Sequence, residues 1–324
     1  ELSNLPSSVM TEEEFKKSFY PIIVSNLILD KGIVGMPLEY DALTLYINED
    51  VFTSALKSPP ETWSDLFYLA PKLTQTGNKG VIIQGGVALG ITGNVDHWPE
   101  IISLMLIQNG VNPGKPTGQL SVDVFSFYKS FEKAKVWSDK LPASTLAFSR
   151  GELAMYFGPG SRAGEIVKNN PNLKFRTVKL PQLPKNKPED PDYSYATYWL
   201  HAVSEKSKIK EGAWTFLKYL AREDSLKKIN EKIEELESFK RVYPRPEMNA
   251  EIAQDRILGS IVAFSYNARS FYLADNTYDG QNGINTLIKN LYKDVVDKGW
   301  GLKNLDKLSQ DLSQILSKFG VKIR

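Results

Sequence analysis

Histidine and cysteine, the side chains that most often bind zinc, are scarce in this sequence. The 324 residues include two histidines, His97 and His201, and no cysteine. The histidines form no HExxH or comparable pair, and the lack of thiols excludes thiolate metal sites, disulfides and cysteine nucleophiles. We therefore predict a protein with no metal site and no cofactor.

Side chains that could act as nucleophiles or general acids lack the spacing that such chemistry requires. The run GPG at 158–160 lies between a predicted strand and a predicted helix, but the rest of a phosphate-binding glycine motif is missing. Ser161 lies in GPGSRAG, which is not the GxSxG elbow of a hydrolase. Asp41 and Asp96 are carboxylates that a glycosidase could use across a cleft, although a sequence does not give their separation.

Aromatic and hydrogen-bonding side chains are plentiful, which favours binding over catalysis. The chain has six tryptophans and 15 tyrosines. Proteins hold sugars by stacking the C–H faces of the sugar on aromatic rings, while polar side chains satisfy the hydroxyl groups, because an unpaired buried hydroxyl is costly. The inventory fits a ligand-binding protein.

The elements that must position these residues alternate between helix and strand. Leu43, Leu45 and Ile47 alternate with polar or aromatic neighbours, as in a strand, and Thr62 is a plausible N-cap for the helix that follows it. This alternation predicts an α/β fold. The expected helices are 11–30, 62–73, 98–110, 121–139, 160–170, 208–237, 249–268 and 281–298, and the expected extended segments are 33–47, 81–83, 152–157, 175–180 and 195–203.

Composition is that of an ordinary folded protein of about two domains, since domains usually span about 100 to 200 residues. Apolar residues make up 42% of the chain and charged residues 24%. The formal net charge is only +2 and no long basic run occurs, which argues against a nucleic-acid partner. No segment reaches the roughly 18 apolar residues that would predict a transmembrane helix.

Three stretches, in order along the chain, are similar to one known family. The first is GMPLEYDALTLYINEDVF from Gly35, followed by SPPETWSDL from Ser58; the second is FSRGELAMYFGPGSRAGEI from Phe148; the third is AVSEKSKIKEGAWTFLKYL from Ala202. Their order and spacing resemble the extracellular solute-binding proteins of ABC importers, in the large group that includes maltose-binding protein. The resemblance covers nearly the whole chain.

The resemblance implies a two-lobed α/β fold of the type II periplasmic-binding-protein kind, with a hinge between the lobes. Segments that cross between the lobes are expected near 38–42, 196–200 and 269–279. The expected lobes are an N-terminal one of 1–40 plus 200–270 and a C-terminal one of 41–199 plus 271–324.

The N-terminus departs from the family pattern. The family normally begins with a βαβ stretch of roughly a hundred residues before the region matched here. We therefore expect the first lobe to be incomplete at its N-terminus. The first residues also lack the basic and apolar regions of a signal peptide, so we expect any such peptide to have been removed upstream of Glu1.

The resemblance also implies which residues meet a ligand. Asp41, beside Tyr40, occupies a position where the family has a sugar-contacting carboxylate. Gly160 stands where the maltose binder has a stacking tryptophan, so polar contacts from its neighbours would replace that platform and favour a smaller or more acidic ligand. The predicted ligand-binding residues are Tyr40, Asp41, Trp98, Ser161, Arg162, Tyr198, Trp199, Tyr278 and Asp279.

Structural alternatives remain open for these residues. They are a solvated turn for Asp41, core packing at a helix start for Trp98, hinge packing for Trp199, and a plain β-turn for Tyr278 and Asp279.

Two polar residues precede the helix that begins at Trp98. His97 is interpreted as structural, because a lone histidine is often a satisfied polar residue. Asp96 could cap that helix and bind nothing.

These observations predict the substrate-binding component of an ABC importer. It would capture a solute, a sugar or oligosaccharide, by closing its lobes, and would deliver it to permease subunits in the membrane without making or breaking a bond. We expect a monomer located outside the cytoplasm, in a periplasm or at a cell surface, with a lipoprotein form left open. The alternatives are a carbohydrate-active hydrolase or lyase that uses Asp41 and a second carboxylate, and an interaction module that lost its ligand.

Overall fold

The computed structural model describes residues 1–185, 187–275 and 277–321. Asn276, in the third expected crossing, and residues 322–324, at the end of the second expected lobe, lie outside the described residues. Buried apolar side chains form two separate clusters. The first core draws on 5–42 and 196–268, and the second core draws on 43–195 and 273–316. The expected lobe limits fall close to the points where the chain passes from one cluster to the other, and the division into lobes stays a prediction.

A five-stranded sheet forms the centre of the second core. Strand β4 is antiparallel to both of its neighbours, so that Leu45 lies opposite Phe157 on one side and Val178 on the other. Strand β6 runs parallel to β7. The strands are, in spatial order, β5 (Gln75–Thr76), β6 (Ile82–Val87), β7 (Leu153–Pro159), β4 (Leu43–Asn48) and β8 (Phe175–Val178).

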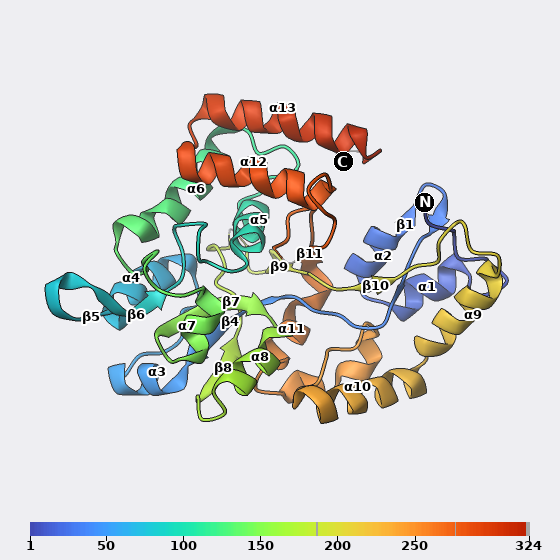
Figure 1. Ribbon diagram of the computed structural model, residues 1–324, viewed down its shortest axis with the longest axis horizontal. Coiled ribbons are helices and arrows are strands. Elements are labelled where there is room, and N and C mark those ends of the chain that lie inside the picture. Colours follow the sequence, from blue (N-terminus) through green and yellow to red (C-terminus); the bar gives the residue numbers. More distant parts are fainter. Residues whose placement is uncertain (186, 276, 322–324) are drawn as a thin grey trace.

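Helices cover this sheet with their apolar faces. Thr62 caps α4 in a reciprocal capping box with Asp65, as its position before an apolar run predicts. The last two helices pack together beside α6 at one end of the molecule (Figure 1). The helices of the second core are α3 (Glu49–Ala55), α4 (Trp63–Leu73), α5 (Trp98–Gln108), α6 (Gly118–Lys133), α7 (Ser144–Ser149), α8 (Arg162–Asn169), α12 (Ile284–Lys298) and α13 (Leu302–Lys318).

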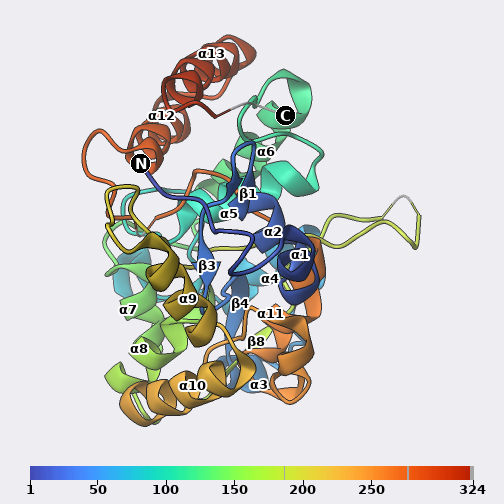
Figure 2. The same ribbon diagram turned by 90° about the vertical axis from the view of Figure 1, so that its right-hand side faces the viewer.

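The first core contains helices together with short strands, and each of these strands is only two residues long. Its strands pair as β1 with β2 and as β3 with β10, both antiparallel. Figures 1 and 2 show its helices grouped away from α12 and α13. The elements are α1 (Glu12–Ser18), α2 (Pro21–Leu27), β1 (Ile28–Leu29), β2 (Gly32–Ile33), β3 (Met36–Pro37), β10 (Leu200–His201), α9 (Lys210–Leu220), α10 (Glu223–Glu237) and α11 (Gly259–Phe264), with short 3-10 turns at 246–249, 252–254 and 265–267.

The segments that pass between the cores lie side by side. Ala42 forms an isolated antiparallel bridge with Ala196, and the Thr197 amide donates to the Asp41 carbonyl at 3.0 Å. Strand β9 (Ser194–Tyr195) pairs in parallel with β11 (Ala268–Arg269). The three expected crossings therefore meet as neighbouring extended strands, an arrangement suited to a hinge.

Several expected elements are interrupted in the structure. The helix expected over 11–30 breaks before Pro21, because proline restricts the preceding residue to extended backbone and Tyr20 is extended. The helix expected over 208–237 ends at Leu220, where the Ala221 carbonyl accepts from the Arg245 Nε–H at 2.9 Å. The helix expected over 249–268 is largely replaced by short turns around Asp255, whose carboxylate accepts two backbone N–H groups.

Two further differences concern the crossings and the C-terminal end. The strand expected over 195–203 is split into β9 and β10, because the chain passes from one core to the other between them. Helix α13 was not predicted, although its sequence carries Leu305, Leu308, Leu312 and Leu316 on one buried face.

Candidate functional site

A cavity of about 820 Å³ lies between the two cores and the segments that cross between them. Its volume falls within the roughly 300 to 1,000 Å³ of small-molecule sites. The first core contributes Asn26, Glu39 and Arg241, and the second core contributes Glu100 and Arg162. The remaining lining comes mainly from the crossings, namely Ala196, Thr197, Tyr198, Trp199, Leu200, Ser270, Phe271, Tyr272, Ala274, Thr277 and Tyr278.

Asp41 lines the cavity, but backbone groups occupy its carboxylate. Oδ1 accepts from the amides of Ala42 at 2.8 Å and Gly160 at 2.7 Å, and Oδ2 accepts from the Ser161 amide at 3.0 Å. Burial raises the pKa of this carboxyl, and the amide donors act in the opposite direction. Asp41 thus fastens the first crossing to the start of α8, which disfavours its use as a glycosidase nucleophile or base.

Gly160 is required by this contact. A Cβ added there would lie 3.0 Å from Asp41 Oδ1 and 2.6 Å from Ile261 Cδ1, so a larger residue would push the turn away from the crossing. The glycine in the predicted GPG turn therefore lets two backbone segments approach closely.

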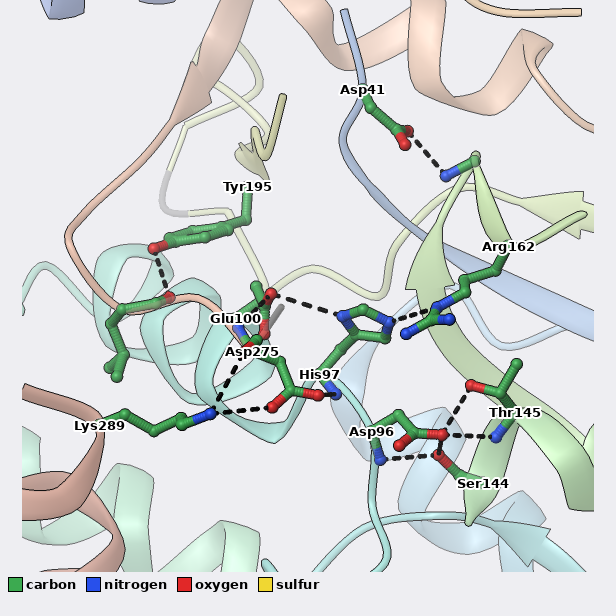
Figure 3. Close-up of polar contacts among 12 residues, drawn as sticks. Asp41, Asp96, His97, Glu100, Ser144, Thr145, Arg162, Tyr195, Asp275 and Lys289 are labelled. Atoms are coloured by element: carbon green, nitrogen blue, oxygen red, sulfur yellow. Dashed lines mark hydrogen bonds and ion pairs between the residues drawn. The ribbon is translucent and has the colours of Figure 1, made fainter. Parts of the chain in front are cut away.

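Arg162 reaches the cavity as the first residue of α8 and contacts two side chains, of which Figure 3 shows His97. Its Nε–H donates to His97 Nε2 at 3.0 Å, and its Nη1 forms an ion pair with Glu165 at 2.6 Å. His97 Nδ1 lies 3.4 Å from Glu100 Oε1. His97 and Glu100 are 2% and 1% exposed, so both lie at the bottom of the cavity with almost no contact with solvent.

The bottom of the cavity is joined to the third crossing by Asp275. The His97 amide donates to Asp275 Oδ2 at 3.3 Å, and the Asp275 amide donates to Glu100 Oε1 at 2.9 Å. Lys289 Nζ, on α12, lies 3.4 Å from Asp275 Oδ1. The reciprocal pair of bonds, drawn in Figure 3, fixes this segment against the start of α5.

Asp96, which could have capped α5, instead bonds to α7. Its Oδ2 accepts from the Thr145 amide at 2.9 Å and from the Thr145 hydroxyl at 2.6 Å. The residue next to Trp98, His97, has a φ of +61° and occupies the N-cap position of α5 without a side-chain cap. Asp96 therefore does not cap α5, and the structural interpretation of His97 stays a prediction.

The wall from the first core carries a half-buried carboxyl group, that of Glu39. Burial raises the pKa of Glu39, the charges of Asp41 and Glu237 act in the same direction, and Arg241 opposes them. Arg241 also forms an ion pair with Glu237. Asn26 Nδ2 donates to Tyr198 Oη at 3.1 Å, which links α2 to the second crossing.

Two exposed aromatic rings stack on each other in the cavity lining. The ring centroids of Trp199 and Tyr278 lie 5.8 Å apart with an interplanar angle of 25°. Trp199 is 55% exposed and Tyr278 is 89% exposed, which is unusual for side chains of this size in a folded protein. Trp199 comes from the second crossing, and Tyr278 comes from the end of the third.

The structure brings most of the predicted site residues together and leaves three outside the cavity lining. Tyr40 is 1% exposed and packs between Tyr20 and Tyr198 in the first core. Trp98 is 4% exposed and belongs to the second core, because its ring turns inward at the start of α5. Asp279 accepts from the Asn285 amide and the Thr286 hydroxyl, both at 2.7 Å, and so caps the first turn of α12. Asp41, Ser161, Arg162, Tyr198, Trp199 and Tyr278 line the cavity.

Sequence reasoning missed several polar residues of the lining. Glu100 had a readable signal, since it is the one charged residue in the apolar helix WPEIISLMLIQ. Glu39 directly precedes Tyr40 and Asp41 and could have been included with them. Arg241 and Asn26 had no local signal, because only tertiary packing brings them to the cavity.

The described residues contain neither a group of metal ligands nor a membrane-spanning helix. Over 1–185, 187–275 and 277–321, no three His, Cys, Asp or Glu side chains are grouped so as to hold a metal ion. In the same part of the chain, no helix is long and apolar enough to cross a bilayer.

Comparison with known protein families gives a match over most of the chain. Residues 8–256 match the family model described as bacterial extracellular solute-binding protein. A putative binding protein of Brucella abortus is 26% identical over 226 residues, covering 65% of this chain and 52% of that protein. A probable ABC transporter-binding protein of Deinococcus radiodurans is 25% identical over 250 residues, covering 68% of this chain and 54% of that protein. The chain therefore spans about half the length of these curated relatives.

Solved structures share the fold at low sequence identity. An ABC transporter solute-binding protein of Thermotoga lettingae, bound with α-D-tagatose, has a TM-score of 0.70 at 18% identity, covering 97% of this chain and 80% of that one. The sugar-binding protein of Xanthomonas citri has a TM-score of 0.69 at 15% identity, covering 98% and 80%. The maltotriose-binding protein of Thermus thermophilus has a TM-score of 0.67 at 17% identity, covering 98% and 80%.

These matches confirm the predicted fold, a two-lobed α/β protein of the type II periplasmic-binding kind. They also agree with the family suggested by the three sequence stretches, since all three lie within the matched range. The chain belongs to the family of bacterial extracellular solute-binding proteins.

Proposed function

We propose that this protein captures a carbohydrate in the cavity between its two cores and delivers it to the permease of an ABC importer. The observation that carries the proposal is a cavity of about 820 Å³ whose walls come from both cores and combine exposed aromatic rings with polar groups. The family and the fold are those of substrate-binding proteins, which are not enzymes. Non-catalytic capture is therefore the function that this cavity supports best.

The lining suits the chemistry of a sugar. Trp199 and Tyr278 offer exposed ring faces to the apolar side of a pyranose or furanose ring, and Arg162, Ser161 and Asn26 offer hydrogen-bonding groups to its hydroxyls. The structural neighbours from Thermotoga lettingae and Thermus thermophilus are bound with tagatose and maltotriose. We extend a carbohydrate ligand of that kind to this chain.

Closure of the two cores would couple capture to transport. A solute that contacts both walls binds the closed state better than the open state, and this difference shifts the population toward closure. The closed form is what the permease subunits would recognise, with the protein acting as a monomer and without a cofactor. Membership of an extracellular family places the protein outside the cytoplasm, and we propose a periplasmic or cell-surface location.

A ligand panel tests the proposal. Maltotriose, mannotriose, tagatose, amino acids and polyamines would each be added to the protein during thermal unfolding, followed by calorimetric titration. A sugar at 100 times its Kd should stabilise the fold by about 2.7 kcal/mol. Stabilisation by amino acids or polyamines alone would contradict a carbohydrate ligand, and sugar hydrolysis by the pure protein would contradict simple capture.

One substitution ties binding to the cavity. Trp199→Ala should weaken a sugar that binds by about tenfold, because an aromatic contact is worth roughly 0.5 to 1.5 kcal/mol, and it should leave stability unchanged. Tyr219→Ala is the matched control, since Tyr219 on α9 is 51% exposed but does not line the cavity. Equal affinity for the sugar in both variants would remove Trp199 from the site.

A further inference from the structure

His97 holds its proton on one particular nitrogen, as assigned from its hydrogen bonds. The Arg162 guanidinium can only donate, and its Nε–H points at His97 Nε2 at 3.0 Å. Nε2 must therefore be unprotonated in this arrangement, and the proton of the neutral ring lies on Nδ1. That nitrogen faces Glu100 Oε1 at 3.4 Å, an acceptor that suits an Nδ1–H donor.

Glu100 is held so that it can select this tautomer. Its Oε1 also accepts from the Asp275 amide at 2.9 Å, which fixes the carboxylate beside the imidazole. Glu100 is 1% exposed and lies in the first turn of α5, where the helix dipole favours a negative charge. Its Oε2 is buried without a hydrogen-bond partner among the described residues, so the carboxylate is kept inside at a cost in free energy.

We propose that Glu100 and His97 are positioning residues that hold Arg162 in the cavity for contact with the solute. This inference rests on the proposed function and adds to it the reason for a buried Glu–His pair beneath the cavity. The Arg162 side chain is 22% exposed. Besides its hydrogen bond to His97, it forms an ion pair with Glu165, whose side chain is 44% exposed. An exposed pair of that kind orders a long side chain weakly, whereas a bond to a buried imidazole fixes its direction.

Charged and titratable side chains from several elements surround His97. Its own element supplies Glu100 and the adjacent Asp96, and the nearest cation is Arg162. The neighbouring elements add Glu165 on α8, Tyr156 on β7, Asp275 in the third crossing and Lys289 on α12. Protonation of His97 at Nε2 would remove the acceptor and place a second cation against Arg162.

Solute affinity should therefore depend on pH in a defined direction. The neutral imidazole is the form that holds Arg162, so affinity should be full at pH 8 and fall as His97 gains its second proton. Loss of one hydrogen bond to a charged group corresponds to about a tenfold loss of affinity.

NMR of the full chain tests the tautomer without any solute. The two imidazoles of 15N-labelled protein would be observed in long-range 1H–15N spectra from pH 5 to 8, with His201→Gln used to assign them. We expect His97 to show a protonated Nδ1 and a bare Nε2 at pH 8, and Glu100→Gln to weaken that preference. A His97 protonated at Nε2 at pH 8 would overturn the proposal.

Two substitutions of His97 connect the tautomer to binding, with maltotriose as the probe, or tagatose if maltotriose does not bind. His97→Gln places an amide oxygen near the position of Nε2, so it should keep affinity within about threefold and lose the pH dependence. His97→Asn suits the left-handed backbone of this position but is too short to reach Arg162, so it should bind about tenfold more weakly at every pH.

The outcomes separate this inference from the proposed function. Equal affinity in the Gln and Asn variants would overturn the role of His97 while leaving sugar capture intact. Failure of every sugar in the panel to bind, with the expected tautomer present, would overturn sugar capture, and the NMR result would still support the Glu100–His97–Arg162 arrangement.

Discussion

The two cores support the cavity in different ways. The wall from the second core rests on a five-stranded sheet, and its Arg162 is held from below by the buried pair His97 and Glu100. The wall from the first core rests on strands of two residues and on packed tyrosines, with the ring centroids of Tyr20 and Tyr40 4.8 Å apart. Its charged residues are paired with each other near the surface.

This difference suggests a division of labour between the walls. A hydrogen-bonded sheet resists deformation. Polar side chains on elements that pack against the sheet therefore keep their orientation when a solute binds. Short strands and helices are held mainly by side-chain packing and can shift with less loss. We expect the second core to set the orientation of the solute and the first core to adapt during closure.

The largest effect should come from truncating each core at a matched leucine. Leu45, on the central strand β4, is 0% exposed, and Leu27, at the end of α2, is 2% exposed. Leu→Ala substitutions in cores cost about 2 to 5 kcal/mol of unfolding free energy. The cost rises when neighbouring atoms cannot move to fill the void that the substitution leaves. Urea unfolding should therefore show a larger loss of stability for Leu45→Ala than for Leu27→Ala. The comparison between the cores fails if Leu27→Ala is the more damaging.

A smaller effect is expected where the first crossing meets the second core. Asp41→Ala would leave the amides of Gly160, Ser161 and Ala42 without their acceptor, and a buried donor left unpaired costs about 1 to 3 kcal/mol. Asp41→Asn keeps one acceptor oxygen and should cost less. Chemical denaturation would measure both, with Asp50→Ala as the control because the Asp50 side chain is 63% exposed. A neutral Asp41→Ala would show that the crossing is not fastened there.

The smallest effect concerns the buried carboxyl of the first wall. The pKa of Glu39 is raised in the folded protein, mainly by burial, so its contribution to stability is present below its ordinary pKa of 4.5 and is lost as pH rises through the folded value. Glu39→Gln removes this dependence. Its stability relative to wild type should be nearly equal at pH 4 and higher by up to about 1 kcal/mol at pH 7.5. A variant that is less stable at pH 7.5 would mean that attraction to Arg241 outweighs burial.

Local patterns in the sequence predicted the regular elements well where tertiary structure agrees with them. The alternation around Leu45 predicted β4, and Thr62 before an apolar run predicted the start of α4. The same patterns overextended helices at Tyr20 and Ala221, and they left α13 unpredicted. At Ala221 a side chain from elsewhere in the chain takes the carbonyl, which no local pattern contains.

The candidate site divides in the same manner. Aromatic residues of the crossings, such as Trp199 and Tyr278, could be proposed from the positions where the resemblance to the family implies ligand contacts. Trp98 and Tyr40 were proposed on the same grounds, yet each ring turns into a core. A sequence gives the position of a residue on the chain but not the direction of its side chain, which depends on how neighbouring elements pack.

The sequence by itself determined the class of this protein: its alternation of helix and strand, its lack of cysteine, and the ordered stretches that mark the solute-binding family. Only the tertiary structure decided the roles of the polar residues. Three backbone amides bond to the Asp41 carboxylate, which still lines the cavity, and His97 lies between Glu100 and Arg162. Hydrogen bonds between distant segments depend on distances of a few tenths of an ångström, and those distances exist only once the chain has packed.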